Sequence, residues 1–334
     1  MDASENPFYR IREQVRAITG YTDVSPITGG FSFEQKYLLT GGDATPYLVR
    51  IIHTPHQNDL LKKHEEFRIL SRLRQYSKLV PGTIAFGTTD DRSLCFMILT
   101  YCPGNDAEGI LASLSDEEQY LLGVEAGREL KRLHGMPAPA MLPEWSYTIS
   151  SKFKRKCCAF IDNGLDLPGM DLPKITAFVE RNLPCIRSTR QTFLHDDYHP
   201  GNLIIQNKKL SGIIDFNRYD WGDPIHDFVK LGYFSRAVSI PFSAGQVDGY
   251  HGGSPRPEFW QRYSLYCAMT IVADVLWSAL YEEQGGVSGE MNRALQRDAM
   301  VIADHEQFTS AVPKWYRNYQ RPATVRSFGS GEKQ

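Results

Sequence analysis

The sequence has no excess of charge of either sign. Its 334 residues include 37 lysines and arginines against 39 aspartates and glutamates, which gives a formal net charge of −2. A dedicated nucleic-acid-binding protein, or one held at a membrane surface by a polybasic patch, needs a strong positive field. The near-neutral balance argues against both, so we expect neither a nucleic acid nor a membrane as partner.

Signals for export, membrane insertion and zinc binding are also lacking. The N-terminal segment is polar and charged and has no apolar core of signal-peptide length. The most apolar stretch, residues 267–281, is short for a membrane span and carries Asp274 in its middle. The six cysteines form no C-x-x-C pair and no cluster with histidine at zinc spacing. We therefore expect a cytoplasmic protein with reduced cysteines.

What is present is the composition of a folded globular chain, with 42% hydrophobic and 23% charged residues. The length suggests two domains or one large two-lobed domain. A chain of this length can bury a large core without disulfides or metal ions.

The first hundred residues are typical of a small β-rich unit. Strand segments are indicated by β-branched and aromatic side chains, and a helix by apolar residues at helical spacing. The predicted elements are a hairpin at 26–40, a strand at 45–53, a helix at 60–76 and two strands within 84–101. We place this unit at residues 1–101.

The chain after Pro103-Gly104 is mostly helical. Ser115 followed by Glu118 predicts a capping box that opens a helix. The predicted elements are helices at 115–135, near 151–163, at 172–182 and at 257–283, with one short hairpin formed by 202–206 and 210–216. We place this larger unit at residues 102–312 and treat residues 313–334 as a partly mobile C-terminal tail.

The strongest chemical signal lies in residues 193–228. His195, Asp197 and Asn202 form the pattern H-x-D-x-x-x-x-N, and a predicted strand ending at Asp215 follows. In phosphoryl transfer, one aspartate accepts or orients the hydroxyl proton, while an asparagine and a second aspartate hold the magnesium ions that neutralise the phosphates. Magnesium prefers such oxygen ligands. The segment therefore predicts phosphoryl transfer.

The same segment resembles the catalytic core of the aminoglycoside phosphotransferase / choline kinase-like family, small-molecule relatives of the eukaryotic protein kinases. That family reads approximately H-G-D-x-H-P-G-N, then I-D-F or I-D-W, then G-D-P. This sequence has H-D-D-Y-H-P-G-N, I-I-D-F and G-D-P in the same order. The resemblance covers roughly residues 24–285. It implies an α+β, bilobal protein-kinase-like fold, with a small antiparallel β-sheet in the N-terminal lobe and a mostly helical C-terminal lobe.

The resemblance also implies roles for individual residues. Asp197 is the catalytic base, Asn202 and Asp215 are metal ligands, and His195, within the catalytic loop, and Asp223 are structural. Asp196 stands where the family has glycine. It can raise the pKa of the base, contact a cationic substrate, or point away from the site. We expect His199 to pack the loop rather than to act as an acid or base.

Residues of the first unit match the family's nucleotide site. In that family a hairpin tip brings backbone N–H groups to phosphates, a strand cation grips the phosphates, a helix carboxylate holds the cation, and the lobe junction contacts adenine. The corresponding residues are Gly29, Gly30, Phe31 and Ser32 at the tip, Arg50 on the strand, Glu66 on the helix, and Thr100, Tyr101 and Cys102 at the junction. Glu65 is the alternative partner of Arg50, but Glu66 fits the family's E-x-x-x-L-x-x-L better.

The acceptor pocket is predicted with less specific signals. Asp274, Trp277 and Glu282 lie on the last long helix, and a carboxylate beside an indole suits a cationic or sugar-like acceptor. The alternative is that the aromatic residues of this helix form a core stripe and its carboxylates face water. Asp196 and Tyr198 of the catalytic loop are further candidates.

A basic run, Lys152 to Lys156, predicts a solvated helix face. It contains Lys152, Lys154, Arg155 and Lys156, and the aromatic residues typical of nucleic-acid binding are not interleaved with these cations.

The sequence therefore predicts an enzyme that transfers phosphate from ATP, or from GTP, to a hydroxyl of a small molecule with the help of Mg²⁺. An aminoglycoside-like antibiotic is the leading acceptor, and a metabolic kinase of choline, ethanolamine, homoserine or sugars is the alternative. A nucleotide-binding pseudokinase is disfavoured because Asp197, Asn202 and Asp215 are all intact. A protein kinase is disfavoured because the sequence lacks an A-P-E segment. We expect a monomer or a homodimer.

Overall fold

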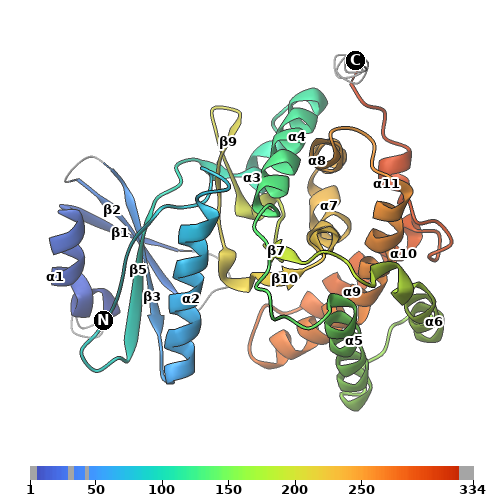
Figure 1. Cartoon of the computed structure of the whole chain (residues 1–334), viewed down its shortest axis with the longest axis horizontal. Helices are drawn as coiled ribbons and strands as arrows, with labels where there is room; N and C mark the ends of the chain where they lie inside the picture. The colour runs from blue at the N-terminus through green and yellow to red at the C-terminus, as the bar shows by residue number, and fades with distance from the viewer. Residues whose placement is uncertain (1–5, 29–33, 42–44, 323–334) are drawn as a thin grey trace. The chain divides into compact units, whose positions relative to one another are not determined.

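The computed structural model describes residues 6–28, 34–41 and 45–322 (Figure 1). The chain forms two compact units: the first holds Met1–Gly104, Ile204–Gln206 and Ser211–Asn217, and the second holds Asn105–Leu203, Asn207–Leu210 and Arg218–Gln334. Residues 211–217 belong to the first unit because they bond to it. Ser211 Oγ donates to the Pro103 carbonyl at 2.9 Å, and the Ile213 N–H donates to the Leu79 carbonyl at 2.9 Å. The observed units therefore differ in this segment from the continuous units predicted at 1–101 and 102–312.

The first unit is built on a five-stranded antiparallel sheet in the order β1-β2-β3-β5-β4. Its elements are β1 (Asp23–Ile27), β2 (Gln35–Thr40), β3 (Tyr47–His53), α2 (Gln57–Leu73), β4 (Thr83–Thr88) and β5 (Leu94–Thr100). The predicted hairpin, strand, helix and strand pair are all present. Helix α2 begins and ends earlier than the predicted range 60–76.

An N-terminal helix, α1 (Pro7–Thr19), was not predicted. It begins with a side-chain cap, since Asn6 Oδ1 accepts the Phe8 N–H at 3.0 Å, and Pro7 occupies a favourable first-turn position. It ends at Gly20, whose φ of +62° is the left-handed conformation that glycine adopts at low cost. The capping residues Asn6, Pro7 and Gly20 are sequence signals from which this helix could have been predicted.

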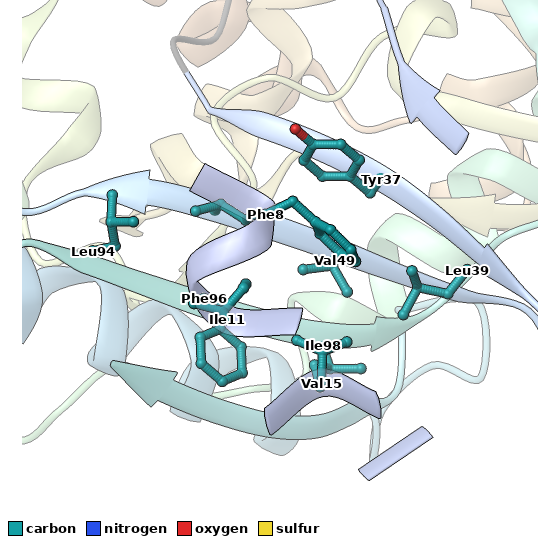
Figure 2. Packing of buried hydrophobic residues seen from close by; sticks show 10 residues of the cluster. Phe8, Ile11, Val15, Tyr37, Leu39, Val49, Leu94, Phe96 and Ile98 are labelled. Carbon is teal, nitrogen blue, oxygen red and sulfur yellow. The ribbon is translucent and has the colours of Figure 1, made fainter. Parts of the chain in front are cut away.

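Helix α1 and the sheet share one hydrophobic core. Figure 2 shows that the apolar face of α1 packs against inward-facing side chains of the strands. The core comprises Phe8, Ile11 and Val15 from α1 with Tyr37, Leu39, Val49, Ile51, Leu94, Phe96 and Ile98 from the sheet. Because side chains alternate along a strand, Arg50 lies on the opposite face from Val49 and Ile51. That face carries the charged part of the first unit.

The second unit is mostly helical. Its helices are α3 (Ala107–Leu111), α4 (Asp116–Leu133), α5 (Trp145–Asp162), α6 (Leu172–Asn182), α7 (Arg236–Val238), α8 (Ile240–His251), α9 (Pro257–Glu283), α10 (Glu290–Asp304) and α11 (Lys314–Arg317). Its short strands are β6 (Asn105–Asp106), β7 (Thr192–Leu194) and β10 (Asp220–Gly222). The hairpin strands β8 (Leu203–Gln206) and β9 (Lys209–Ile213) are divided between the two units, with residues 204–206 and 211–213 in the first. The capping box of Ser115 and Glu118 is confirmed at the start of α4. Helices α8 and α10 were not predicted.

Helices α4 and α8 touch backbone to backbone. Gly123 and Gly127 of α4 face α8, and Gly245 and Gly249 of α8 face α4. A Cβ atom at any of these four positions would overlap a backbone carbonyl of the other helix. Glycine is therefore required here for close helix approach.

Helix α9 forms the centre of the second unit. It is long and apolar enough to cross a membrane by length and composition, with a mean hydropathy of 1.4. However, 72% of its most apolar window is buried inside the protein. A buried helix that is apolar all round is typical of a globular core.

Residues 313–322, predicted as part of the tail, are packed into the second unit. Trp315 and Tyr316 of α11 are buried. The Asp248 carboxylate of α8 accepts the Tyr120 hydroxyl at 2.7 Å and the Tyr316 hydroxyl at 2.5 Å, and it accepts two bonds from the Arg321 guanidinium at 2.6 and 3.0 Å. The helical unit therefore continues beyond the predicted end at residue 312.

We predict that Gly245→Ala destabilises the protein by about 1–3 kcal/mol, because the added methyl group forces α4 and α8 apart. Gly109→Ala in α3 is the matched control, since a Cβ there meets only Asp106 Oδ1 at an ordinary 3.5 Å. The control should change stability by less than about 1 kcal/mol, in the stabilising direction. Urea unfolding of both variants checks this, and equal stabilities would contradict the close packing.

Candidate active site

The catalytic loop begins where β7 ends, and Asp227 holds its first residues. The backbone N–H groups of His195 and Asp196 donate to the two oxygens of the Asp227 carboxylate at 2.8 and 2.7 Å. Asp227 is 1% exposed, and the His134 ring at the end of α4 lies 3.0 Å from it. The carboxylate thus joins three segments and fixes the direction in which the loop leaves the strand. The sequence analysis missed Asp227.

Asp197 is held from several sides. Its N–H donates to His195 Nδ1 at 3.3 Å, and the amide of Asn202 donates to its carbonyl at 2.9 Å and to its carboxylate at 3.3 Å. Lys230 Nζ lies 2.9 Å from Asp197 Oδ1. Burial alone would raise the pKa of Asp197, but the charge of Lys230 together with His199 lowers it to about 2. The carboxylate is therefore ionised and oriented at neutral pH.

Lys230 is a site residue that the sequence analysis missed. It follows the segment G-D-P-I-H-D-F and lies three residues after Asp227, one helical turn further along the chain. Its ammonium also lies 5.1 Å from the centre of the Phe234 ring, within the range of a cation–π contact. The sequence signal that could have identified Lys230 is its position one helical turn after Asp227, the aspartate that anchors the loop.

The Asn202 side chain has the geometry of a cation ligand. Its amide nitrogen is used in the bonds to Asp197, which leaves the carboxamide oxygen as the group able to bind a metal ion. His199 caps the short helical turn before Asn202 by accepting the Gly201 N–H at 3.2 Å. Burial lowers the pKa of His199 to about 4, so it is neutral at pH 7, and its ring packs on Phe234. This environment agrees with the expected packing role.

Asp223 fixes the G-D-P turn. The residue is fully buried, and its carboxylate accepts the Ile225 N–H at 3.1 Å and the Tyr266 hydroxyl at 2.9 Å. Tyr266 in turn accepts the Trp145 indole N–H at 2.8 Å. These bonds agree with the structural role expected for Asp223.

In the first unit, Arg50 lies in a buried network of four charges. Its guanidinium lies 2.7 Å from the Glu66 carboxylate and 2.6 Å from the Glu34 carboxylate. Lys63 bridges the same two glutamates at 2.7 and 2.9 Å. Burial acts to lower the pKa of Arg50, but the two carboxylates raise it. Of the two glutamates considered from the sequence, Glu66 is therefore the partner, and Glu34 and Lys63 are additional members that the sequence analysis missed.

Glu65 points to a different surface. It forms an exposed pair with Arg68 at 3.4 Å. The hairpin tip residues Gly29, Gly30, Phe31 and Ser32 lie outside the residues that the structure describes.

The predicted junction residues are only partly free to bind a ligand. The Thr100 N–H donates to the Gly82 carbonyl at 2.8 Å, and the Tyr101 N–H donates to the Pro46 carbonyl at 3.1 Å. Among the described residues, the Cys102 N–H has no acceptor. The contact of the Thr100 to Cys102 backbone with adenine therefore stays a prediction, in which the Cys102 N–H is the donor left available.

Asp215 combines a strained backbone with a carboxylate that lacks a partner. Its φ of +64° lies in the left-handed region, which is uncommon for a residue other than glycine. The residue is half-buried, and within the described part of the chain its carboxylate has no hydrogen bond or ion pair. A half-buried carboxylate that forms no ion pair with the described residues fits a metal ligand.

Most predicted acceptor residues have internal partners. Tyr198 is fully buried and its hydroxyl donates to the Ala126 carbonyl at 2.8 Å, so the structure contradicts a direct substrate contact. Asp274 receives two bonds from Arg297 at 3.0 and 3.1 Å, and Glu282 accepts the Met291 N–H at 3.0 Å. Tyr198 and Asp274 are therefore corrected from candidate ligands to structural groups, whereas the role of the half-buried Glu282 stays a prediction.

Two predicted acceptor residues remain accessible. Trp277 is 43% exposed and stacks on Tyr281 with ring centres 5.0 Å apart, and the Arg218 guanidinium lies 5.8 Å from its ring. The Asp196 carboxylate lies 3.1 Å from His226 Nδ1 and is about one-third exposed. Asp196 has a φ of +60°, a conformation in which glycine is favoured.

Comparisons with known proteins identify the family of this chain. The sequence matches the model of the phosphotransferase enzyme family over residues 23–261. No curated protein matches the sequence. Among solved structures, the complex of APH(2")-IIa with streptomycin and ATP is 18% identical, covers 95% of this chain and 98% of that chain, and has a TM-score of 0.60.

Two further structures are similar. The GDP complex of aminoglycoside 2'-phosphotransferase-IIIa is 18% identical, with 87% of this chain and 97% of that chain covered and a TM-score of 0.64. A thermostable mutant of aminoglycoside phosphotransferase APH(4)-Ia, in a ternary complex with AMP-PNP and hygromycin B, is 13% identical, with 87% and 97% covered and a TM-score of 0.61. At these identities the likeness shows the fold. Together with the family match and the catalytic-loop geometry, it establishes that this chain belongs to the phosphotransferase enzyme family and has the α+β, protein-kinase-like fold that its motifs predict.

Proposed function

We propose that this enzyme transfers the γ-phosphoryl group of ATP, or of GTP, to a hydroxyl group of a small molecule with the help of Mg²⁺. The observation that carries the proposal is the environment of Asp197. Its ionised carboxylate is positioned by Asn202 and Lys230 on a loop in which two backbone N–H groups are anchored by Asp227. Support for the nucleotide comes from similar structures described with ATP, GDP or AMP-PNP.

The nucleotide would bind the first unit. Arg50 is oriented by Glu66 and Glu34, and the neighbouring Lys63 adds a second cation to the same network. Such a preorganised guanidinium suits phosphate oxygens. Cys102 offers a backbone donor without a partner among the described residues, which suits the edge of a purine base.

Asn202 and Asp215 are the residues that would hold Mg²⁺. The carboxamide oxygen of Asn202 and the carboxylate of Asp215 are hard oxygen donors, and neither is occupied by a protein cation in the described residues. Bound magnesium would neutralise the negative charge of the phosphates.

Asp197 would orient the acceptor. Its carboxylate accepts a hydrogen bond from the acceptor hydroxyl and takes the proton as the new P–O bond forms. The bond between the γ-phosphorus and the bridging oxygen breaks, and the nucleoside diphosphate leaves with the electron pair. Because phosphoryl transfer depends mainly on positioning and charge stabilisation, a carboxylate with a low pKa is sufficient for this role.

Two classes of acceptor remain as proposals. An aminoglycoside-like antibiotic is supported by similar structures described with streptomycin, gentamicin or hygromycin B. A metabolic kinase of choline, ethanolamine, homoserine or sugars is the second candidate, and its neutral sugar acceptors agree best with an Asp274 that is engaged by Arg297 rather than free to bind an ammonium group. For either acceptor we propose a cytoplasmic monomer or homodimer.

A coupled ADP-release screen over aminoglycosides, macrolides, choline, homoserine and sugars tests the proposed function.

Once the screen has identified the substrate, Asp197→Asn should lower kcat by about 10²–10⁴-fold, because the substrate hydroxyl loses the carboxylate that accepts its hydrogen bond. Calorimetry should show nearly unchanged ATP binding, since the base and the nucleotide grip are separate. Turnover within a few-fold of wild type would reject the assigned mechanism.

We expect Asp215→Asn to raise the Mg²⁺ concentration needed for ATP binding by at least about tenfold, because a charged oxygen ligand is lost. Asp90→Asn is the control, since Asp90 is an exposed aspartate of the same unit without a partner among the described residues. Calorimetric titration of ATP at several Mg²⁺ concentrations measures this. An unchanged Mg²⁺ requirement in Asp215→Asn would exclude it as a ligand.

Glu66 and its neighbour Glu65 provide a matched pair of variants. Glu66→Gln should raise the KM for ATP by about tenfold, because Arg50 is no longer held by a full negative charge. Glu65→Gln, on the exposed side of α2, should leave the KM unchanged. Thermal melting of both variants separates a loss of folding from a loss of nucleotide grip. Similar KM values for the two variants would contradict the role of the buried network.

A further inference from the structure

Asp196, the residue before the proposed base, has an unusual backbone conformation for an aspartate. Its φ of +60° lies in the left-handed region, and the family motif has glycine at this position. Glycine would make the same backbone turn at lower cost, so the geometry of the loop alone does not account for an aspartate here. A side chain kept in such a conformation beside reacting groups points to a function of that side chain.

The Asp196 carboxylate lies beside His226 and is open to a ligand. Its Oδ1 lies 3.1 Å from His226 Nδ1, and the side chain is about one-third exposed. Among the described residues no other hydrogen bond or ion pair reaches this carboxylate, so Oδ2 is available. Burial acts to raise the pKa of Asp196, but His226, followed by Lys230 and Lys152, lowers it. The carboxylate is therefore an anionic hydrogen-bond acceptor at neutral pH.

The His226 ring is itself fixed by aromatic packing. It meets the Trp145 ring edge-on with ring centres 5.4 Å apart, and it meets the Tyr266 ring edge-on at 5.2 Å. These two aromatic residues are buried and joined by the bond from the Trp145 indole N–H to the Tyr266 hydroxyl at 2.8 Å. The imidazole is thus held in place, and it gives the Asp196 carboxylate a rigid support of the kind that binding groups need.

Asp196 and Asp197 face the same helical segment. Residues 224–238 are helical without a break. His226 of this segment lies at the Asp196 carboxylate, and Lys230, four residues later, lies 2.9 Å from the Asp197 carboxylate. Helix residues four apart are neighbours, with Cβ atoms about 6 Å apart. One small molecule can therefore contact both carboxylates.

Three neighbouring carboxylates of the second unit already have strong partners. Asp197 and Asp220 each have a lysine partner, at 2.9 and 2.5 Å, and Asp227 accepts two backbone N–H groups. Within the described part of the chain, the Asp196 carboxylate is contacted by the His226 imidazole alone. A partly buried carboxylate oxygen without a donor is stabilised by a ligand that donates a hydrogen bond.

We propose that Asp196 binds a second hydrogen-bond donor of the acceptor, a hydroxyl or an ammonium group close to the hydroxyl that Asp197 orients. The inference rests on the proposed phosphotransferase function and names the acceptor class as polyols, sugars and amino alcohols. Choline falls outside this class, because its quaternary ammonium carries no N–H. Asp196 is a specificity-determining residue, since it binds a part of the acceptor that does not react, and His226 is its positioning residue.

Acceptors that differ in the second donor test this inference. Ethanolamine, glucose, glucosamine and kanamycin carry such a donor, whereas choline has a hydroxyl and a positive charge but no second donor. Turnover is measured by coupled ADP release and binding by calorimetry, both on the full chain. We expect at least one of the four donor-bearing compounds, and ethanolamine in direct comparison, to exceed choline by at least about tenfold in kcat/KM or in affinity.

Asp196→Asn and Asp196→Gly remove the carboxylate, and Asp162→Asn is the control for the same chemical change. Asp162 is an exposed aspartate at the end of α5 without a partner among the described residues. Both Asp196 variants should raise the KM or Kd of the best donor-bearing compound by about tenfold, with less than about threefold change in kcat and unchanged ATP affinity. Asp162→Asn should behave as wild type. Because glycine suits a φ of +60°, Asp196→Gly should melt no lower than wild type.

Glucose and glucosamine identify the donor that is recognised. A larger loss for glucosamine than for glucose in Asp196→Asn identifies an ammonium group, and an equal loss identifies a hydroxyl. His226→Phe keeps an aromatic ring against Trp145 and Tyr266 but removes the nitrogen beside Asp196. It should raise the KM or Kd of the same compound by about threefold, with kcat and melting temperature unchanged.

Four results would overturn the inference. They are unchanged KM and Kd values in both Asp196 variants, use or binding of choline equal to that of ethanolamine, a parallel fall of kcat and melting temperature in Asp196→Gly, and neither turnover nor binding of any donor-bearing compound. Binding of a donor-bearing compound that is lost in the Asp196 variants and kept in Asp162→Asn, but without ADP release from any compound, would support the Asp196 site and count against the proposed phosphoryl transfer.

Discussion

The buried carboxylate of Asp227 determines where the catalytic loop starts and which way it runs. It accepts two successive backbone N–H groups, from His195 and Asp196, and it contacts His134 at the end of α4. With both oxygens satisfied, a charged group is tolerated at 1% exposure. The hydrogen bond from the Asp196 N–H to Asp227 accompanies the left-handed conformation of Asp196. The next residue, Asp197, lies 2.9 Å from Lys230. Asp227 thus anchors the start of the loop, and Asn202 and Lys230 then orient the base one residue further on.

Each compact unit contains its own group of ion pairs, and the two groups have different arrangements. In the first unit, Arg50, Lys63, Glu34 and Glu66 alternate in sign and are largely buried, so that the guanidinium is fixed in one orientation. Buried pairs of this kind contribute little net stability, because desolvation opposes the Coulomb attraction. These ion pairs instead hold the Arg50 guanidinium in one orientation. In the second unit, Lys230 and Lys152 are each paired with one aspartate, Asp197 and Asp220, so that the charges beside the catalytic loop are held in place by single partners.

Sequence patterns predicted the elements and the catalytic loop well, but not the partners of individual charges. The loop motif is contiguous, and the capping box and the apolar spacing of helix 257–283 are local signals, so they could be predicted without knowledge of tertiary contacts. Asp227, Lys230, Glu34 and Lys63 were missed because a buried ionic partner carries no distinctive pattern until the chain folds. The same limit explains the wrong roles given to Tyr198 and Asp274. An aromatic or acidic residue on a helix or loop has the same sequence signal whether it faces a ligand or an internal carbonyl or guanidinium.

The glycine contact between α4 and α8 has a mechanical consequence for the loop. At the four glycine positions the backbones of α4 and α8 meet directly. No side chains lie between them there that could change rotamer and let one helix move against the other, so the two helices form one rigid pair. The helix pair contacts the catalytic loop through the Ala126 carbonyl, which accepts the Tyr198 hydroxyl, and it contacts Asp227, the residue that anchors the loop, through His134. At its other side, Asp248 ties Tyr316 and Arg321 of the C-terminal segment to α8. A chain of hydrogen bonds and helix contacts therefore connects the C-terminal segment to Tyr198, the residue beside the base, although no part of that segment belongs to the catalytic motif.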